Sequence, residues 1–356
     1  MNFDLTEDRQ MLADSLGRYL GDRYGVETRN KLAYDAPFHS PGKWAELAEL
    51  GIPGALAPEA AGGFGGTGFD ITVVFEALGR TLCPEPYLGT LMASRLLMAA
   101  GADQDTLIDG SQRFAVALSE IDAPYDALTM QATATRDGDR VLLSGRKSAV
   151  YGGHAADVVL IAALLDGRPA LFRAEATDLQ IAAYPMIDGG GAAEILLDDS
   201  PATLLIEDAT EALADATRAG RLALCAEAVG AMDAAYAILL DYLKTRKQFG
   251  TTIGSFQVLQ HRTVDLLMEI EQARSITIAA AAALDGPQGP ATCAMAKTLI
   301  GRTARLVAEE TIQMHGGIAM TWEYAASHYA KRLTMIDHQL GDTDQCLSEV
   351  MQTYAA

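Results

Sequence analysis

The sequence predicts an α+β protein that is mainly α-helical and consists of three consecutive parts. Helical periodicity covers residues 1–110 and 209–356, and short β-rich runs fill residues 111–208. Helices and strands that are segregated along a chain in this way are typical of α+β proteins. We therefore expect an N-terminal helical domain, a middle antiparallel β domain and a C-terminal four-helix bundle.

The N-terminal part, residues 1–110, reads as helices interrupted by one glycine-rich loop. Thr6 is a suitable N-cap for the first helix, and Glu7 and Asp8 follow in the first turn, where the helix dipole favours acids. The loop at residues 58–68 holds five glycines, which permit positive φ or a close backbone approach. It is either a long turn between helices or a contact with a ligand.

The middle part, residues 111–208, predicts a small antiparallel β domain. Turns that contain Gly and Asp, as at residues 137–139, separate its short runs. The expected strands cover residues 114–118, 130–135, 140–143, 158–165 and 193–197.

Long Ala- and Leu-rich segments dominate the C-terminal part, residues 209–356. Long helices that are joined by short loops predict an antiparallel bundle. The expected helices cover residues 211–246, 256–284, 291–315 and 322–336.

The composition narrows the possible partners. The 356 residues include 27 Lys and Arg against 47 Asp and Glu, a net charge of −20. This charge repels nucleic acid and anionic membranes, so we expect neither as a partner. A bound phosphate would need local cations, which Arg246 and Lys247 provide. The cysteines lack metal-ligand spacing, so we expect no metal site. The N-terminus lacks a targeting pattern, and the apolar run 158–165 is too short to span a membrane. We therefore expect a cytoplasmic protein.

Two segments carry a recognisable motif. Residues 241–257 (DYLKTRKQFGTTIGSFQ) and 313–317 (QMHGG) resemble the flavin-binding signature of acyl-CoA dehydrogenases. The domain order is that of the same family, and short blocks agree along essentially the whole chain. The blocks at residues 83–90 and 331–337 are more similar to the small (beta) subunits of heteromeric members, such as the pimeloyl-CoA dehydrogenase small subunit.

The resemblance implies an FAD-dependent reaction that inserts a double bond beside a CoA thioester. A carboxylate removes the α proton while a hydride leaves the β carbon for the flavin. The protein must hold FAD, polarise the thioester carbonyl and present a base whose pKa is raised by desolvation. Electrons then pass to an electron-transfer flavoprotein.

The resemblance also assigns cofactor residues. Arg246 and Phe249 are expected on one helix face, where Arg246 supplies a donor to the flavin pyrophosphate. The alternative interpretation of Arg246 is a solvated cation at the C-terminal end of the helix, where the dipole favours positive charge. In the family this half of the site reaches across to the flavin of a neighbouring subunit. The implied set is Arg246, Gln248, Phe249, Gln257, Gln313, Gly316 and Gly317.

The half that would hold this chain's own flavin departs from the family pattern. Ser119 keeps a hydroxyl before Glu120, and it is the residue expected to bond a flavin there. Ala149 and Tyr151 align with positions that line the flavin ring in the family. Tyr151 either occupies the space of the ring or is an ordinary strand tyrosine.

The catalytic base is the largest departure. Leu340 occupies the usual glutamate position, and Gly220 occupies the alternative position on an earlier helix. Asp342 and Asp344 are the nearby carboxylates, but both are shorter than Glu and shifted in register. Asp342 is either an N-cap of the terminal helix or a substitute base.

These observations favour a non-catalytic subunit. The hypothesis is that the chain is the small subunit of a heteromeric acyl-CoA dehydrogenase in an α2β2 assembly, with a larger partner that carries the glutamate. The substrates would be CoA thioesters of dicarboxylic acids, fatty acids or steroid side chains. One alternative is a self-sufficient homo-oligomeric dehydrogenase that uses Asp342 as base, and another is a flavin-free structural subunit.

Overall fold

The computed structural model describes residues 5–125, 129–138 and 140–355. The chain divides into two compact units. Unit 1 comprises Met1–Arg29, Ile71–Cys83 and Arg221–Ala356, and unit 2 comprises Asn30–Asp70 and Pro84–Gly220. The division of the chain into domains at 1–110, 111–208 and 209–356 stays a prediction, although β1 begins at Phe114 and α8 begins at Thr210, close to the expected boundaries.

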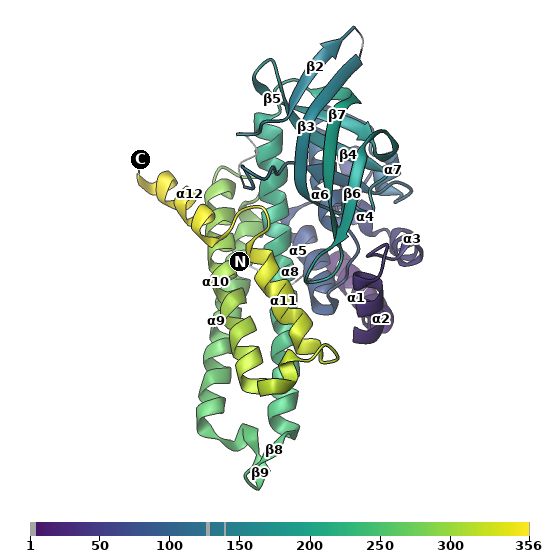
Figure 1. Ribbon diagram of the computed structural model, residues 1–356. Helices are drawn as coiled ribbons and strands as arrows, with labels where there is room; N and C mark the ends of the chain where they lie inside the picture. The colour runs from purple at the N-terminus through teal and green to yellow at the C-terminus, as the bar shows by residue number, and fades with distance from the viewer. Residues whose placement is uncertain (1–4, 126–128, 139, 356) are drawn as a thin grey trace. The chain divides into compact units, whose positions relative to one another are not determined.

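Unit 1 is helical apart from one short hairpin (Figure 1). Its elements, some of which begin in the other unit, are α1 (Glu7–Arg23), α5 (Gly68–Thr81), α8 (Thr210–Thr245), β8 (Lys247–Gln248), β9 (Thr251–Thr252), η3 (Ile253–Ser255), α9 (Gln257–Ala283), α10 (Gly289–His315), η4 (Gly316–Met320), α11 (Ala325–Asp337) and α12 (Thr343–Ala355).

The predicted helices of unit 1 are present close to their expected limits. The Thr6 side chain caps α1 by accepting a hydrogen bond from the Arg9 N–H, as predicted. The long helix α8 is apolar and long enough to cross a membrane, but 72% of its most apolar window is buried inside the protein. Burial of this kind is what the core helix of a helical bundle shows.

Helices α5 and α8 cross at very close range through a pair of glycines. A Cβ atom on Gly79 of α5 would lie 2.0 Å from the Glu227 carbonyl oxygen, and one on Gly230 of α8 would lie 2.1 Å from the Glu76 carbonyl oxygen. No side chain fits at either position, so each helix backbone packs directly on the other. Around the crossing, Arg274 pairs with Glu76 (3.3 Å) and with Asp233 (2.6 Å).

We expect Gly79→Ala to lower the free energy of unfolding by about 1–3 kcal/mol, because the added methyl forces the two backbones apart. Gly17→Ala is the matched control: Gly17 is exposed in α1, and a Cβ there meets nothing within 4 Å. That change should stabilise the protein by up to about 1 kcal/mol. Denaturant titration of both variants measures the difference; equal stabilities would show that the crossing tolerates separation.

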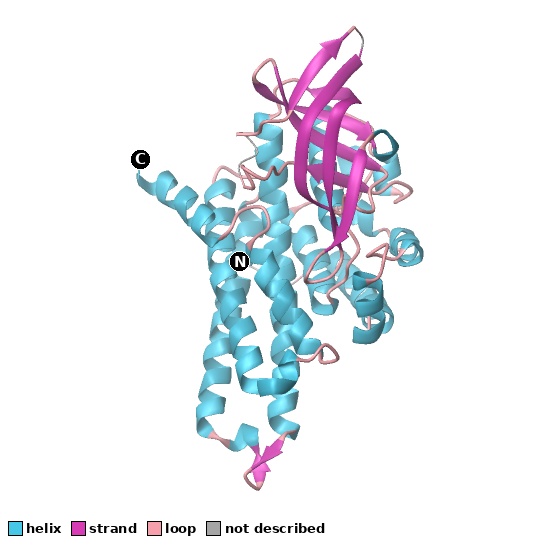
Figure 2. Cartoon of the chain, in the orientation of Figure 1, coloured by secondary structure: helices cyan, strands magenta, loops and turns pink. Residues whose placement is uncertain are grey.

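Unit 2 combines helices with a β domain (Figure 2). Its elements are α2 (Val26–Tyr34), α3 (Pro41–Glu49), α4 (Ile52–Ala55), η1 (Glu59–Ala61), α6 (Tyr87–Ala100), α7 (Asp105–Ile108), β1 (Phe114–Ala117), β2 (Thr133–Asp137), β3 (Arg140–Tyr151), β4 (Val158–Leu165), β5 (Arg168–Glu175), η2 (Ala176–Asp178), β6 (Gln180–Pro185) and β7 (Gly191–Ile206).

The sheet of unit 2 closes on itself. Strand β4 pairs with β2 on one side and with β5 on the other, and β3 and β7 complete the ring β4-β2-β3-β7-β5. Strand β1 pairs with β4, and β6 pairs with β7. Apolar side chains such as Leu143, Ile161, Phe172 and Ile195 fill the inside, so the described strands form a small barrel with a packed core.

The middle domain is mainly antiparallel, as predicted, with two exceptions. Strand β4 runs parallel to β1 and to β2.

The strands β5 and β6 are absent from the predicted set. Residues 168–175 contain Pro169 and two arginines, and residues 180–185 show only a weak alternation of polar and apolar side chains. Neither run therefore has the apolar pattern of a buried strand.

The glycine-rich loop between α4 and α5 packs on its own preceding segment. Cβ atoms on Gly63 and Gly65 would lie 2.2 Å from the carbonyl oxygens of Ala57 and Ala55. The Gly65 N–H donates to Ala57 O (3.0 Å), and the Gly66 N–H donates to Ala55 O (2.9 Å). Close packing of the backbone within the loop therefore accounts for these glycines. This supports the interpretation of the segment as a long turn between helices.

Candidate functional site

The β8–β9 hairpin follows directly after α8. Phe249 and Gly250 form its two-residue turn, with φ values of 54° and 81°. Two residues with positive φ fit the twist of paired strands, as in type I′ turns. The Phe249 side chain is 90% exposed, and its ring contacts Phe256 edge-on with centroids 6.1 Å apart. The hairpin therefore presents an aromatic side chain to the outside of unit 1.

Arg246 lies between α8 and the hairpin. Its N–H donates to Tyr242 O (2.8 Å), and its carbonyl accepts from the Ile253 N–H (2.9 Å), while its side chain is exposed. The prediction that Arg246 and Phe249 share a helix face is wrong, because α8 ends at Thr245 and the chain turns at residues 249–250. Gln248 in β8 and Gln257, the first residue of α9, are also exposed.

The segment with Gln313, Gly316 and Gly317 ends α10. Gly316 has a φ of 69° and donates its N–H to Ile312 O, so it caps the helix. The side chain of Gln313 is exposed, and a Cβ on Gly317 would meet nothing within 4 Å. The capping of α10 therefore explains the glycine at position 316, whereas the backbone at Gly317 is open to the surroundings.

An aromatic cluster joins the end of α8 to the end of α10. The His315 ring lies 4.7 Å from the ring of Tyr242 and 5.2 Å from that of Tyr324, centroid to centroid. Its Nδ1 is 2.7 Å from Thr311 O. Burial lowers the pKa of His315, which favours the neutral ring. The structure thus brings the hairpin and the Gln313–Gly317 turn to the same end of the helices in unit 1.

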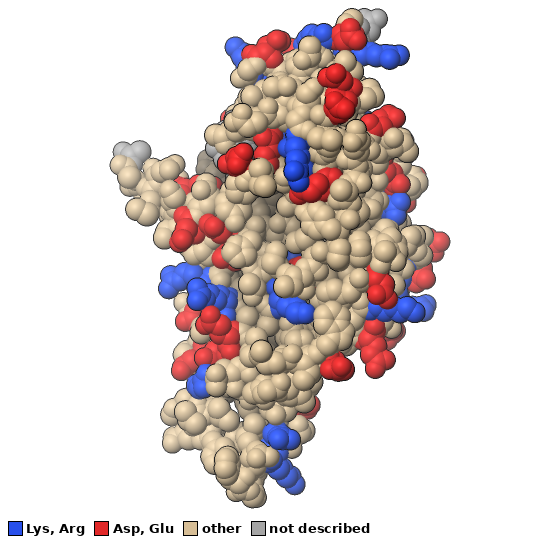
Figure 3. Space-filling view, viewed as in Figure 1, with Lys and Arg blue, Asp and Glu red and all other residues tan. Residues whose placement is uncertain are grey.

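The charge at this end differs from the charge of the whole chain. Arg246 and Lys247 are both exposed, and on the face drawn in Figure 3 the charged side chains at the hairpin are basic. A protein with a net charge of −20 therefore places cations beside an exposed ring and two glutamine amides. Such a group of donors suits a phosphate-bearing cofactor.

Ser119 lies in unit 2, on a segment that a buried ion pair fixes. The Ser119 carbonyl accepts from the Ser148 N–H (2.9 Å). The neighbouring Glu120 accepts from Lys147 Nζ at 2.7 Å and from the Gln131 N–H at 2.6 Å. Burial would raise the pKa of Glu120, but the hydrogen bonds from Lys147 and the Gln131 amide outweigh it, so the pKa is lowered. The Ser119 side chain is half-buried.

A bulge in β3 positions the residues that precede Tyr151. Ala149 has a φ of 51°, and the pairing register with β7 shifts between Lys147 and Val150. Glu194 of β7 fixes this bulge by accepting from the Ala149 N–H (3.1 Å) and the Ser148 hydroxyl (2.9 Å). Tyr151 is half-buried at the end of β3.

Leu340 occupies a left-handed turn between α11 and α12. Its φ is 55°, and that of Gly341 is 106°. Arg221 Nε donates to Leu340 O (2.6 Å). The fully buried Lys297 donates to Gly341 O (2.6 Å) and to Asp337 O (2.9 Å). The side chains of Arg221 and Lys297 thus hold the turn through its backbone carbonyls. The side chain at position 340 itself is apolar and cannot accept a proton.

The Asp342 carboxylate has a structural partner. Its Oδ1 accepts from the Gln345 N–H (2.8 Å), as an N-cap at the start of α12 does. Gly220 precedes Arg221 within α8, and Arg221 pairs with Glu349 of α12 (2.5 Å). The described residues at the two base positions of the family, 220 and 340, therefore bear no carboxylate.

Sequence reasoning did not identify the cations that hold this turn. Lys297 is the single charged residue in residues 289–301 of α10, and Arg221 directly precedes the uncharged run 222–226 of α8; both are buried. A lone charge in an apolar helix must find a partner when it is buried. That pattern was the available signal for Lys297.

Comparison with known proteins decides the family. The acyl-CoA dehydrogenase N-terminal domain matches residues 6–105, and the acyl-CoA dehydrogenase C-terminal domain matches residues 210–350. The acyl-CoA dehydrogenase IpdE2 of Mycobacterium tuberculosis is 31% identical over 331 residues, which cover 92% of this chain and 91% of that protein. The chain belongs to the acyl-CoA dehydrogenase family. Acyl-CoA dehydrogenases are FAD-dependent oxidoreductases that act on acyl-CoA.

Two solved structures share the whole fold. The Tcur3481-Tcur3483 steroid ACAD has a chain that is 29% identical, with a TM-score of 0.90 and 98% of each chain covered. A chain of the ChsE4-ChsE5 complex from Mycobacterium tuberculosis has a TM-score of 0.92 at 22% identity and covers 100% of this chain and 99% of its own. The predicted fold, with helices on either side of a β domain in the sequence, is confirmed.

Proposed function

We propose that this chain is the small subunit of a heteromeric acyl-CoA dehydrogenase and completes a flavin site whose catalytic glutamate belongs to a larger partner. The observation that carries the proposal is Leu340. Its turn is intact and held by Arg221 and Lys297, yet the residue presented there is apolar. The Asp342 carboxylate, the nearest substitute, caps α12.

The residues that would serve the partner are accessible. Arg246, Gln248 and Phe249 are exposed at the hairpin, and Gln313 is exposed at the end of α10. These groups fit the phosphate and ring surfaces of FAD, because they offer charged and amide donors beside an aromatic side chain. Bound FAD would accept the hydride from the β carbon of the thioester. The residues of this chain would bind and orient the cofactor and would move no proton.

An apolar surface supports an assembly. On α9, the side chains of Val264, Leu267 and Met268 are 56%, 40% and 53% exposed. Their spacing places them on one side of the helix. An exposed helical stripe of this kind suits helix packing against another subunit, and we propose an α2β2 tetramer that buries it.

The similar structures agree with a heteromer. The Tcur3481-Tcur3483 steroid ACAD and the ChsE4-ChsE5 complex are each named for two proteins. We propose an acyl-CoA thioester as substrate, with a fatty acid or steroid side chain as the acyl group. The electron acceptor would be an electron-transfer flavoprotein, and the site of action the cytoplasm.

Flavin content and native mass test the proposal. The chain is purified alone, and again after co-expression with a candidate large acyl-CoA dehydrogenase subunit. We expect flavin and a heterotetramer to appear only in the co-expressed sample. A yellow homo-oligomer that turns over acyl-CoA without a partner would contradict the proposal and would make Asp342 the candidate base.

A further inference from the structure

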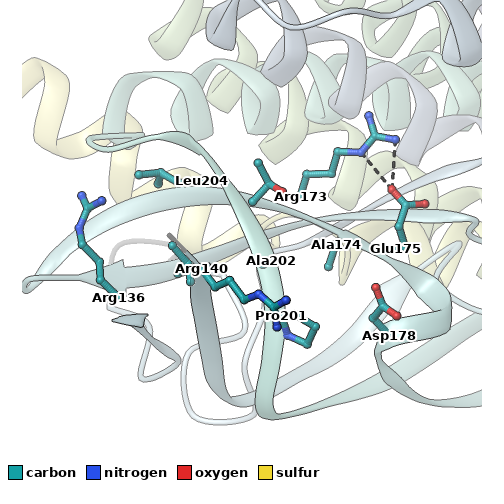
Figure 4. A pocket seen from close by; sticks show the side chains of 11 residues that line it. Arg136, Arg140, Arg173, Ala174, Glu175, Asp178, Pro201, Ala202 and Leu204 are labelled. Carbon is teal, nitrogen blue, oxygen red and sulfur yellow. Dashed lines mark hydrogen bonds and ion pairs between the residues drawn. The ribbon is translucent and has the colours of Figure 1, made fainter. Parts of the chain in front are cut away.

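The hollow where β5 and β7 separate in unit 2 does not bring its charged groups together. It has a volume of about 490 Å³, and Arg136, Arg140 and Arg173 are among the residues that line it. The β2–β3 register puts Arg136 and Arg140 on opposite faces of their hairpin. Arg173 lies over the Phe114 ring at 5.8 Å and pairs with Glu175. Figure 4 shows the three guanidinium groups pointing apart, so these arginines form no common site.

The two segments of unit 1 that resemble the flavin signature, residues 241–257 and 313–317, meet through three aromatic rings. Tyr242 lies in the last turn of α8, His315 ends α10, and Tyr324 is the N-cap of α11. The Tyr242 and Tyr324 rings lie 6.3 Å apart, centroid to centroid, with an interplanar angle of 68°. Each ring therefore contacts both others, and the two closer contacts, at 4.7 and 5.2 Å, involve His315.

The last turn of α8 holds the β8–β9 hairpin through backbone contacts. The Arg246 N–H donates to Tyr242 O (2.8 Å), and the Arg246 carbonyl accepts from the Ile253 N–H (2.9 Å). A Cβ atom on Gly254 would lie 2.7 Å from Leu243 O, so the segment after the hairpin packs directly on this turn of the helix. The position of the last turn of α8 therefore fixes the position of the hairpin.

His315 belongs to the second segment itself. It lies between Gln313 and Gly316, and its side chain is 4% exposed. Its Nδ1 donates to Thr311 O (2.7 Å), a hydrogen bond that remains within α10. Burial lowers the pKa of His315, while the backbones of Thr311 and Ile238 act against this shift, so the ring also lies beside α8. The ring contacts connect α10 to α8 and to the start of α11.

We propose that His315 is a positioning residue, whose ring contacts hold the β8–β9 hairpin in a fixed relation to the Gln313–Gly317 turn. A cofactor that is bound by both segments requires their donors at a set separation, and this consequence rests on the proposed function. The link itself is independent of a cofactor, because all of its contacts lie within unit 1 of this chain.

Hydrogen–deuterium exchange of the full chain, purified alone, tests the link. His315→Gln keeps a hydrogen-bond donor but removes the ring, whereas His315→Phe keeps a ring and removes the hydrogen bond to Thr311. We expect the amides of residues 246–253 to exchange about tenfold faster in His315→Gln, because two aromatic contacts are lost, and to change little in His315→Phe. A role that depends on the hydrogen bond within α10 alone predicts the reverse order.

Tyr242 provides the same test from the side of α8, where the ring is only half-buried. Tyr242→Leu removes the ring and should accelerate the exchange of the same amides, while Tyr242→Phe keeps the ring and should not. His338→Gln is the matched control, because His338 is an exposed histidine at the end of α11, and it should leave the hairpin unaffected. The amides of β4 in unit 2 are the internal reference for global unfolding.

The FAD affinity of the co-expressed complex tests the consequence for the cofactor. We expect His315→Gln to weaken FAD binding by a factor similar to its effect on exchange, and His315→Phe to bind as the wild type does. Unchanged hairpin exchange in His315→Gln and Tyr242→Leu, or equal acceleration in His315→Gln and His315→Phe, would overturn the inference. Faster exchange with unchanged FAD binding would support the link and would contradict the assignment of these segments to a flavin.

Discussion

Arg246→Ala should remove FAD from the assembled complex. On the proposed function, the guanidinium of Arg246 donates charge-assisted hydrogen bonds to the flavin pyrophosphate, each worth about 1.5–3 kcal/mol. The loss corresponds to a flavin affinity about ten- to hundredfold weaker. The side chain of Arg246 is exposed, so the fold of unit 1 should be unaffected. The ratio of flavin absorbance to protein, after desalting of the complex, measures the effect.

Lys244→Ala is the matched control for this experiment. Lys244 lies in the last turn of α8, one residue before the helix end, and is also exposed. The change removes one positive charge from the same end of unit 1. Lys244 lies within the motif segment 241–257 but is not among the residues assigned to the flavin. Full flavin retention in Arg246→Ala, or an equal loss in Lys244→Ala, would refute the assignment.

Glu120→Gln should be the most destabilising polar substitution in unit 2. Lys147 is fully buried, and its carboxylate partner Glu120 lies 2.7 Å away. Removal of that charge leaves a buried cation without a counterion, which costs about 3–5 kcal/mol. The double variant Glu120→Gln with Lys147→Met removes both charges and should recover much of the loss. Denaturant titration of the wild type and both variants measures the three free energies of unfolding.

The pH dependence gives the same prediction a second readout. The pKa of Glu120 is lowered in the folded protein. The stabilisation that its ion pair with Lys147 gives is therefore present at pH values above the ordinary carboxyl pKa, and it disappears as the pH falls through the pKa of Glu120 in the folded protein. The stability gap between wild type and Glu120→Gln should therefore narrow in acid. Glu309→Gln is the control, because its ion pair with Arg305 is exposed to solvent and should contribute little to the stability. A gap that is independent of pH would contradict the ion-pair explanation.

The helices were predictable because their signals are local. The Thr6 cap and the long Ala-rich segments lie within a few turns of the structure they specify, and the structure places α1 and α8 accordingly. Strand β5 was not predictable in the same way. Arg173 alternates with Phe172, which enters the barrel, and only the pairing with β4 and β7 makes that run a strand.

The sequence marks the residues of the candidate site, whose assignment to a flavin stays a prediction, but it does not give their geometry. The motif marks Arg246 and Phe249, whereas the turn at Phe249 and Gly250 depends on positive φ at two positions, one of them not glycine. The roles of Arg221 and Lys297 depend on contacts with residues more than forty positions away. Long-range contacts of this type leave no periodic trace in a single sequence.

The closed ring of strands sets an order of folding for unit 2. The pairs β2–β3 and β4–β5 are hairpins between neighbouring segments, so each can form as soon as its own residues are available. Strand β7 pairs with both β3 and β5, and it is the last barrel strand in the sequence. During synthesis the ring therefore stays open until Ile206 has left the ribosome. Because non-local pairing slows folding, we expect closure by β7 to be the slow step, with the apolar faces of the two hairpins exposed until then.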